Sequence, residues 1–354
     1  MSTFKRIGVL TSGGDAPGMN AAIRAVARTA LSRGVEVMAI YRGYSGLIDG
    51  DIRPFELRDV SNIINKGGTV LYSDRCPEFK TEAGMARAVE TCKRFAIDGI
   101  VAIGGDGTFR GATDLTSHGI PCIGIPGTID NDITSTDSTI GFDTAMNTVT
   151  ELIDKLRDTC ESHARCNVVE VMGRGAGDIA LYTGIASGAT QVVIPEFPHD
   201  DESICKKIRK GREIGKRNFI VVVSEGVGSD YAPALAKRIQ KDTGVETKFA
   251  RLAHIVRGGN PTLRDRVLAS RMGVAAVEEL LRGNSNLVIC ERDGNIISTE
   301  IRYALALDKM YKGTLTDDER ARLTDGEIEM MKAEIERKEA KMLELYAVEN
   351  KINI

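Results

Sequence analysis

Short apolar runs alternate with amphipathic helical stretches along almost the whole chain. The runs have the length of buried strands, and the stretches between them carry apolar residues at helical spacing. Strands are predicted at 6–12, 35–41, 99–103, 121–125, 167–172, 191–195, 219–224, 247–253 and 286–290. Helices are predicted at 19–31, 142–160, 201–213, 230–242 and 262–282, and others fill most remaining gaps. This alternation predicts a doubly wound α/β architecture with helices on both sheet faces.

The number of strands predicts two domains. Because this number of strands is larger than that of a usual single sheet, we expect two Rossmann-like α/β domains that share a cleft. The first spans 1–140 and the second 141–313, with the chain able to cross back near its C-terminal end. After Gly313 the composition becomes charged and helical, which predicts a C-terminal helical extension over 314–354.

The extension carries apolar residues at a spacing of three to four, broken by Lys338. These residues are Met331, Ile335, Met342 and Leu345. The pattern predicts an amphipathic helix that docks on its own subunit or on a neighbour. The alternative is a solvated, charged helix.

An acidic turn follows the predicted strand 121–125. It reads Pro126-Gly-Thr-Ile-Asp-Asn-Asp132, and in an extended segment Thr128, Asp130 and Asp132 point to the same side. Carboxylates placed in this way can hold Mg²⁺ and accept the proton of a substrate hydroxyl, which phosphoryl transfer requires. The alternative is a solvated turn without a ligand.

Two glycine-rich turns stand in equivalent places after other apolar runs. They are Thr11-Ser-Gly-Gly-Asp-Ala-Pro-Gly18 and Gly104-Gly-Asp-Gly-Thr108. Glycines let the backbone approach a phosphate, and a following helix offers free N–H groups and a positive dipole end. Each turn alone is also compatible with a merely tight connection, and neither matches a Rossmann or Walker pattern. Together with the acidic turn they predict a phosphate-and-magnesium site at the carboxyl ends of strands.

Composition narrows the class of protein. The 354 residues are 42% hydrophobic and 27% charged, which is ordinary for a soluble chain of this size. A net charge of −3 gives no electrostatic reason to expect binding to nucleic acid or membranes. The N-terminus runs straight into a strand and no apolar run approaches the length of a membrane span, so we expect a cytoplasmic protein.

The seven cysteines are scattered, mostly within apolar strands, which favours buried and reduced thiols. Cys160, His163 and Cys166 are evenly spaced. Three candidate ligands without a fourth nearby make a poor zinc site. The metal that the sequence leads us to expect is the Mg²⁺ of the acidic and glycine turns.

Several blocks of sequence, taken in order, resemble one enzyme family. Over residues 5–313 the chain resembles the bacterial-type ATP-dependent 6-phosphofructokinases almost without gaps. Besides the three turns, the resemblance rests on Val169-Glu-Val-Met-Gly-Arg174, His254-Ile-Val-Arg-Gly-Gly259 and Asp265-Arg-Val-Leu-Ala-Ser-Arg-Met-Gly273. It implies the phosphofructokinase fold and ATP-dependent phosphorylation of D-fructose 6-phosphate to fructose 1,6-bisphosphate in glycolysis. It also implies Mg²⁺ bridging the ATP phosphates, and an allosteric homotetramer with shared active sites.

The resemblance assigns roles to the turns. Asp130 would be the general base for the sugar 1-hydroxyl, with Thr128, Arg75 and Arg174 also catalytic. Asp106 and Asp132 would hold or orient Mg²⁺. The residues implied to bind ATP are Gly14, Tyr44, Arg75, Cys76, Gly105, Asp106, Gly107 and Thr108. Cys76 stands where relatives carry an aromatic residue, so packing of the base there is expected to differ.

The resemblance also implies a sugar-phosphate site. Its residues are Thr128, Ile129, Asp130, Met172, Gly173, Arg174, Glu225, His254 and Arg257, with Arg165 and Lys248 reaching over from a neighbouring subunit. By itself His254 is typical of a core histidine in an apolar strand, but the Arg257-Gly-Gly that follows favours a phosphate contact. Lys248 replaces the family's arginine and keeps the charge without the planar fork, so we expect weaker sugar-phosphate affinity.

Two glycines bear on the phosphoryl donor. Pyrophosphate-using relatives carry an aspartate at the position of Gly107 and a lysine at that of Gly127, and those side chains would fill the volume of the α-phosphate. Glycine at both places therefore favours ATP. The alternatives are a pyrophosphate-dependent phosphofructokinase and a nucleotide-sensing regulator, although a regulator should have lost the base Asp130. The second glycine turn also resembles that of NAD kinases and diacylglycerol kinases, which lack the acidic turn.

A second anion site, for ADP or phosphoenolpyruvate between subunits, is the least complete part of the resemblance. The matching residues are Arg24, Arg28, Arg157, Lys216 and Arg217. The alternative is that the arginines pair with local carboxylates such as Asp154 and Asp158. Thr190 replaces a glutamate that orients the effector's Mg²⁺, and Leu57 replaces an arginine, with Arg58 next to it. We therefore expect an anion site with weak or absent activation by ADP.

Overall fold

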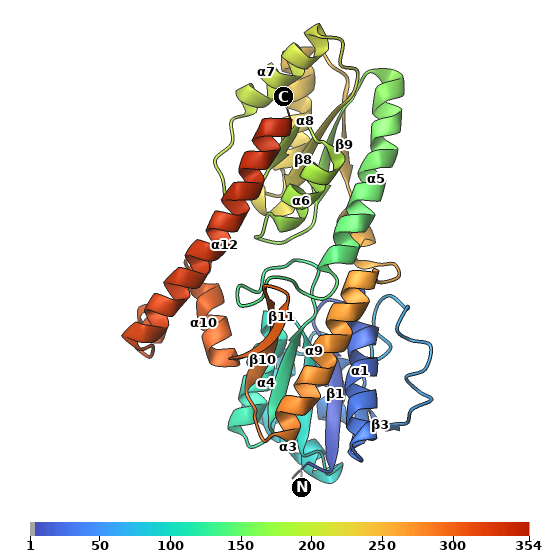
Figure 1. Cartoon of the computed structure of the whole chain (residues 1–354), viewed down its shortest axis with the longest axis vertical. Coiled ribbons are helices and arrows are strands. Elements are labelled where there is room, and N and C mark those ends of the chain that lie inside the picture. Colours follow the sequence, from blue (N-terminus) through green and yellow to red (C-terminus); the bar gives the residue numbers. More distant parts are fainter. Residues whose placement is uncertain (1–3, 354) are drawn as a thin grey trace. The chain divides into compact units, whose positions relative to one another are not determined.

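The computed structural model describes residues 4–353, which form two compact α/β units (Figure 1). Unit 1 contains the residues up to Ile129 together with Ile133–Thr144 and Arg257–Ile335. Unit 2 contains Asp130–Asp132, Ala145–Val256 and the residues from Glu336 onward. The chain thus returns to unit 1 at Arg257, whereas the sequence predicts a second domain that continues to 313.

Unit 1 is built on a seven-stranded sheet in the order β11-β10-β5-β4-β1-β2-β3. Its strands are β1 (Arg6–Ser12), β2 (Glu36–Ile40), β3 (Ile52–Phe55), β4 (Gly99–Gly104), β5 (Cys122–Pro126), β10 (Leu287–Arg292) and β11 (Asn295–Glu300). The inner strands are parallel, and β3 and β11 run antiparallel at the two edges. The sequence predicts the inner strands but misses both edges.

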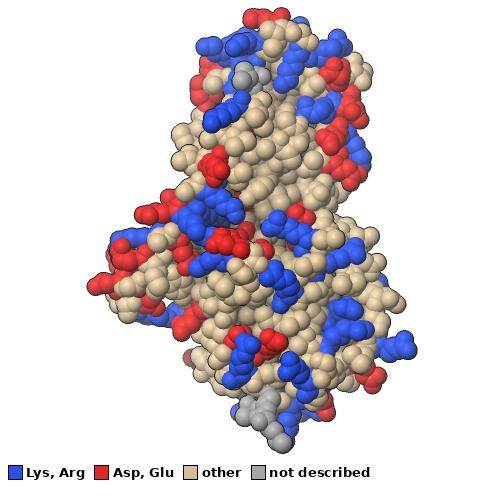
Figure 2. Space-filling model, in the orientation of Figure 1, with Lys and Arg blue, Asp and Glu red and all other residues tan. Residues whose placement is uncertain are grey.

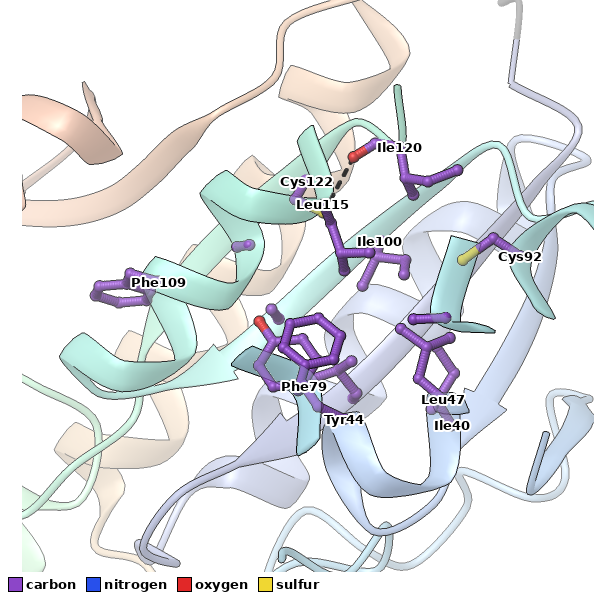
Figure 3. Packing of buried hydrophobic residues seen from close by; sticks show 14 of the residues in the cluster. Ile40, Tyr44, Leu47, Phe79, Cys92, Ile100, Phe109, Leu115, Ile120 and Cys122 are labelled. Carbon is purple, nitrogen blue, oxygen red and sulfur yellow. Dashed lines mark hydrogen bonds between the residues drawn. The ribbon is translucent and has the colours of Figure 1, made fainter. Parts of the chain in front are cut away.

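Helices cover both faces of this sheet. They are α1 (Met19–Ser32), α2 (Gly43–Asp49), α3 (Glu82–Arg94), α4 (Asp106–Ser117), α9 (Leu263–Leu281), α10 (Ile301–Tyr311) and the short η1 (Pro77–Lys80) and α11 (Asp317–Arg320). Figure 3 shows the core under α2, α3 and α4, where Phe109, Leu115 and Ile100 are completely buried. On the opposite face α1 and α9 lie side by side (Figure 1). The predicted doubly wound α/β class is confirmed.

Gly273 explains how closely α1 and α9 approach each other. A Cβ atom at this position would lie 2.7 Å from the Cβ of Ala25 and 2.9 Å from the carbonyl oxygen of Ala22. A larger side chain would push the two helices apart. This contact fixes a late segment of the sequence to the helix that follows the first glycine turn.

Unit 2 has a four-stranded parallel sheet in the order β7-β8-β6-β9. Its strands are β6 (Cys166–Val171), β7 (Gln191–Val193), β8 (Phe219–Ser224) and β9 (Thr247–Arg251). Its helical elements are α5 (Phe142–His163), which starts in unit 1, α6 (Asp178–Ser187), α7 (Asp201–Glu213), η2 (Glu225–Val227), α8 (Tyr231–Thr243) and η3 (Ala253–Arg257). Side chains of α7 and α8, such as Ile208 and Leu235, pack on Val221 and Phe219 of β8 in one core.

The cysteines do not form a metal centre. All seven are unpaired thiols and all but Cys76 are buried. The side-chain amide of Asn167 donates a hydrogen bond to Sγ of Cys160 at 2.9 Å, and burial raises the pKa of that thiol. Within residues 4–353, no three His, Cys, Asp or Glu side chains gather where they could hold a metal ion.

The C-terminal helix α12 (Asp325–Ile352, red in Figure 1) packs on its own chain. Met331 and Met342 of the predicted apolar stripe are buried, and Ile335 and Leu345 are half-buried. In unit 1, the carboxylate of Glu334 accepts hydrogen bonds from two side chains of the same unit, Arg292 at 2.7 Å and Tyr303 at 3.2 Å. The helix is therefore not a fully solvated, charged helix.

The second part of α12 docks on unit 2. The ring of Tyr346 stacks on that of Phe197 with centroids 4.4 Å apart. The completely buried Glu349 accepts hydrogen bonds through Oε1 from the amide of Val192 at 3.0 Å and from Nδ2 of Asn353 at 3.0 Å. Because β7 is the edge strand of the sheet, this carboxylate satisfies an amide that the sheet leaves unpaired.

The buried carboxylate predicts a pH effect on stability. Burial raises the pKa of Glu349 above its ordinary value, although hydrogen bonds from Asn353 and Val192 and the charge of Lys207 lower it in part. A raised folded-state pKa favours folding below the ordinary pKa, and this contribution is lost as the pH rises through the folded-state value. Glu349→Gln keeps the Oε1 acceptor and removes the charge. We expect the melting temperature of the variant, relative to the parent, to rise by roughly 2 °C between pH 4.5 and pH 8.

Thermal melts of Glu344→Gln provide the control for this prediction, because Glu344 is exposed on the same helix. The difference in melting temperature between Glu344→Gln and the parent should not change with pH. An equally flat pH dependence for Glu349→Gln would contradict the role assigned to the buried carboxylate.

The surface is mixed in charge. On the face drawn in Figure 2, basic and acidic side chains are interspersed over both units, in line with the formal net charge of −3. Among the helices within residues 4–353, none is long and apolar enough to cross a membrane.

Candidate active site

The topology of unit 1 brings the two glycine turns together. From β1 the chain adds β2 on one side, and it later adds β4 and β5 on the other. Ligands of such sheets bind at this switch point, beyond the carboxyl ends of the strands. Because Ser12 pairs with Gly104 in the β1–β4 register, the two turns begin side by side.

The second glycine turn presents open backbone at the start of α4. A Cβ atom placed on Gly105 or on Gly107 would meet nothing within 4 Å. Asp106 is the first residue of α4, and its Oδ1 accepts a hydrogen bond from the Gly107 amide at 2.8 Å while Oδ2 pairs with Arg110 at 3.2 Å. Thr108 is buried and donates its hydroxyl to the carbonyl of Ser12 at 3.0 Å, which ties this turn to β1. An anion placed here would face a helix N-terminus.

The first glycine turn lies against a guanidinium. A Cβ atom on Gly14 would lie 2.8 Å from Nη1 of Arg257, which also donates a hydrogen bond to the carbonyl of Asp15 at 3.4 Å. Both residues belong to unit 1. Arg257, predicted for the sugar phosphate, thus lies beside a turn predicted for ATP phosphates.

A loop that carries Arg75 and Cys76 is fastened to the first turn. The hydroxyl of Ser73 donates to the carbonyl of Gly13 at 2.5 Å, and the hydroxyl of Thr11 donates to the carbonyl of Tyr72 at 2.8 Å. Arg75 is exposed, and Cys76 is half-buried against the core. The structure therefore brings the segment of these two predicted ATP residues next to the first turn.

Asn20 is a residue that sequence reasoning missed. Its completely buried side chain donates to the carbonyl of Lys66 at 3.0 Å and accepts from the amide of Val70 at 2.8 Å. It therefore holds the loop that leads to Ser73 and Arg75 against α1. Asn20 lies in α1, two residues after the first glycine turn, and no local pattern in the sequence marks this role.

Tyr44 supports the site from inside the core. Its ring is buried and stacks on Phe79 with centroids 4.0 Å apart, as Figure 3 shows. Its hydroxyl donates to the carbonyl of Thr108 at 2.6 Å. Burial raises the pKa of this phenol well above its ordinary value. The ring predicted to bind ATP is therefore directed at the backbone of the second glycine turn.

The acidic turn is bent, so the expectation of an extended segment is wrong. Strand β5 ends at Pro126, and Asn131 adopts the left-handed conformation with a φ of 53°. Asp130 and Asp132 are nevertheless brought together, because Nε of Arg174 lies 3.4 Å from Oδ2 of Asp130 and its Nη1 lies 3.7 Å from Oδ2 of Asp132. The two carboxylates thus lie near one guanidinium without the extended alternation that the sequence predicted, and their roles stay predictions.

The backbone around Arg174 is held in an unusual conformation. Gly173 has a φ of 146° and Arg174 a φ of 52°. Oε1 of Glu225 accepts hydrogen bonds from the amides of both residues, at 3.2 and 2.9 Å. Left-handed backbone at a non-glycine residue is costly and is typical of functional sites. Glu225 thus serves here as a backbone clamp for the predicted anion-binding arginine.

A cavity of about 450 Å³ opens beside Arg174 within unit 2. This volume is within the range of small-molecule sites. The predicted residues Met172, Arg174, Glu225 and His254 line it. His254 is exposed in the turn η3 and is not in a strand, because β9 ends at Arg251. The predicted residues Thr128 and Ile129 are buried and belong to unit 1.

The cavity also contains an ion pair that the sequence did not reveal. Nε of Arg251 lies 2.6 Å from Oε1 of the buried Glu170, and its Nη2 donates to the carbonyl of Ser229 at 2.9 Å. Both charged residues line the cavity. They sit on the paired strands β6 and β9, and no local motif marks them as partners.

Arg165 and Lys248 meet at the opposite end of the same sheet. Glu246 pairs with Arg165 at 2.7 Å and with Lys248 at 2.9 Å, and these partners lower its pKa to about 2. Arg165 precedes β6, whereas Met172 follows it, so at about 3.3 Å per residue they lie roughly 20 Å apart. Both cations pair with Glu246, and neither is among the residues that line the cavity of unit 2.

The cations predicted for an effector are only partly brought together in unit 2. Arg157 donates to the carbonyls of Ser187 and Gly188 and to Oδ1 of Asn218, at 2.8 Å for Asn218. Burial and the neighbouring Arg157 lower the pKa of Lys216. Arg217 donates to the carbonyl of Glu161 at 3.3 Å. Arg157 is therefore held by backbone carbonyl groups and a side-chain amide. The other two predicted arginines, Arg24 and Arg28, belong to unit 1.

The α/β fold carries glycine turns and carboxylates of the kind that phosphoryl-transfer enzymes use, and comparisons with known proteins give the family. The sequence profile of the phosphofructokinase family matches residues 6–280. The ATP-dependent 6-phosphofructokinase of Halalkalibacterium halodurans is 55% identical over 302 residues, which are 85% of this chain and 94% of that protein. The enzyme of the same name from Bacillus pumilus is 53% identical over 321 residues, or 91% and 98% of the two chains. The chain belongs to the phosphofructokinase family.

The fold comparison agrees. The structure of phosphofructokinase from Saccharomyces cerevisiae matches with a TM-score of 0.83 and 33% identity, over 89% of this chain and 47% of that chain. The chain thus spans about half the length of the yeast protein. The predicted phosphofructokinase fold is confirmed, while the individual roles of the site residues stay predictions.

Proposed function

We propose that this protein transfers the γ-phosphoryl group of ATP to the 1-hydroxyl of fructose 6-phosphate. The observation that carries the proposal is the pair of carboxylates, Asp130 and Asp132, which both lie near Arg174. Arg174 in turn lines a cavity of ligand size. The bacterial relatives that match over most of the chain bear the name of this activity. Asp130 would act as the general base, because its carboxylate can accept the proton of the sugar hydroxyl.

Mg²⁺ would be held by Asp106 and Asp132. Mg²⁺ keeps several waters and takes one or two carboxylates plus substrate phosphates, so two carboxylates suit it. The turn of Asp106 fits this group because both flanking glycines leave open space. When bound, the ion would neutralise charge on the phosphates. The chain's own part would be to cradle those phosphates with the amides of the second glycine turn.

A coupled assay with fructose 6-phosphate tests the proposal and its alternatives. We expect turnover with ATP and Mg²⁺ and none with pyrophosphate. Robust turnover with pyrophosphate would favour the pyrophosphate-dependent alternative. Binding of ATP without any turnover would favour the nucleotide-sensing regulator.

The placement of Arg165 and Lys248 supports a proposal of shared active sites. Since both lie at the far end of the sheet from their own cavity, we infer that they complete the sugar-phosphate site of a neighbouring chain in a homo-oligomer, with a tetramer as the expected assembly. An anion bound there would relieve the crowding of positive charge around Glu246. Their pairing with one carboxylate supports their acting together.

Mixing two defective chains tests this sharing. An Arg165→Ala chain and an Asp130→Asn chain should each be nearly inactive alone. Hybrids should regain activity, because about a quarter of the sites would combine an intact base with an intact arginine if the chains mix at random. Activity of the mixture equal to the sum of the separate chains, or a fully active monomer in sedimentation, would contradict it.

A further inference from the structure

The helix α12 reaches the acidic turn from a part of the sequence that the family profile does not match. That profile ends at residue 280, whereas α12 spans Asp325–Ile352. Within unit 2, Nζ of Lys338 donates a hydrogen bond to the carbonyl oxygen of Asn131 at 3.5 Å. Asn131 stands between Asp130 and Asp132. A side chain of the C-terminal extension therefore contacts the backbone of the segment that carries the proposed base.

Asn131 is the bent residue of the acidic turn and is held by two contacts. Its φ of 53° is in the left-handed region, which asparagine tolerates better than most non-glycine residues do. Its side chain is held as well, because Nδ2 donates to Oδ1 of Asp178 at 3.2 Å, in the first turn of α6. The residue is thus fastened by α6 through its side chain and by α12 through its carbonyl. A turn fixed in both places sets the directions in which Asp130 and Asp132 leave it.

The ammonium group of Lys338 has a reason to stay at this position. Oε1 of Glu196 accepts the amide of Gly177 at 2.7 Å, while its buried Oε2 has no hydrogen bond among residues 4–353. Burial raises the pKa of the Glu196 carboxyl, Asp178 raises it further, and the charge of Lys338 lowers it in part. Attraction to the Glu196 carboxyl therefore helps to keep Lys338 beside Asn131.

We propose that Lys338 is a positioning residue of the phosphoryl-transfer site, through which the C-terminal helix holds Asn131 and so orients Asp130 and Asp132. This inference rests on the proposed function. The docking of Tyr346 on Phe197 and of Glu349 on Val192 fixes α12 on unit 2, so the lysine has a defined place. A site positioned by rigid, packed elements is more precise than one that a loop alone must hold.

Steady-state kinetics of Lys338→Met test the inference, with Lys341→Met as the matched control. Methionine keeps the unbranched stem and removes the ammonium, and Lys341 is exposed on the same helix. We expect Lys338→Met to lower kcat roughly tenfold, since small misplacements of reacting groups are costly. Both KM values should stay within about twofold, because substrate contacts are unchanged. Lys338→Arg, which keeps charge and donor, should recover most of the parent's kcat.

A double variant separates positioning from stability. In Lys338→Met the Glu196 carboxylate loses the neighbouring ammonium group, which could lower the stability of the variant. The double variant Lys338→Met/Glu196→Gln removes both charges and so avoids this effect. We expect the double variant to melt at the parent's temperature but to retain the low kcat. If Lys338→Met does not fold, the kcat of the double variant is compared with that of the parent instead.

Two outcomes overturn the inference alone. These are a parent-like kcat in Lys338→Met and recovery of kcat in the double variant. If the parent chain itself does not phosphorylate fructose 6-phosphate, the proposed function fails and this inference falls with it. The parent's activity thus distinguishes the two failures.

Discussion

Replacing Asp130 by asparagine is expected to lower kcat by about 10²–10⁴-fold, the usual contribution of a general base. Asparagine preserves the size of the side chain and an oxygen that can accept a hydrogen bond from Arg174, but it cannot take the proton of the sugar hydroxyl. Asp130 is only 2% exposed, so little space is available for water to replace the carboxylate. Steady-state kinetics with saturating ATP and fructose 6-phosphate measure the effect.

Asp114→Asn is the matched control for this experiment. Asp114 is exposed on α4 of unit 1, and its neutralisation should leave kcat unchanged. The KM values of Asp130→Asn should shift much less than its kcat. If kcat stays within tenfold of the parent, Asp130 is not the base.

The second large effect is expected at the phosphoryl donor. Gly107→Asp should reduce activity with ATP by about 10²–10³-fold, because a like charge set against the phosphates costs several kcal/mol. The fold should survive this change, since a Cβ atom at Gly107 meets nothing within 4 Å. Gly107 therefore offers a clean test of donor choice by kinetics with ATP.

Gly326→Asp controls for the added charge. Gly326 also has open space around it and lies in the first turn of α12, where an acidic residue is favourable. ATP kinetics of this variant should match the parent. Retention of ATP activity in Gly107→Asp would show that the second glycine turn does not approach the nucleotide.

Gly127, the other donor-specificity position, is less suitable for the same experiment. A Cβ atom there would lie 3.0 Å from Cε of Met19 and 3.1 Å from Cγ2 of Ile103, and both side chains are completely buried. Substitution at this position would disturb the core as well as the site. Close packing against Met19 and Ile103 is therefore a second reason for glycine at position 127, besides the choice between ATP and pyrophosphate.

Much of the fold could be predicted because its inner strands are buried on both faces. Such strands appear as continuous apolar runs, and β1, β4, β5 and β8 were found within a residue of their observed bounds. The edge strands β3 and β11 were missed, since they mix polar and apolar residues and β3 contains Pro54. The edge strands β7 and β9 of unit 2 were nevertheless predicted, so an edge position alone does not hide a strand.

The site could be predicted only where its residues lie in short motifs at strand ends. The turns around Gly105, Asp130 and Arg174 were found in this way. The hydrogen bonds that support the site could not be predicted, because they join residues that are distant in sequence. These bonds link Asn20 to Val70, Glu225 to Gly173 and Lys338 to Asn131. No local pattern encodes such pairs, and only the folded chain brings them together.

The position of the transferred phosphoryl group tests the central claim most directly. The protein would be incubated with Mg²⁺, fructose 6-phosphate and ATP labelled in its γ-phosphate, and the label in the sugar product would be located. We predict fructose 1,6-bisphosphate with the label confined to the 1-phosphate, and loss of that product in Asp130→Asn. Label remaining in ATP or released only as inorganic phosphate, at substrate concentrations that saturate the relatives, would contradict it.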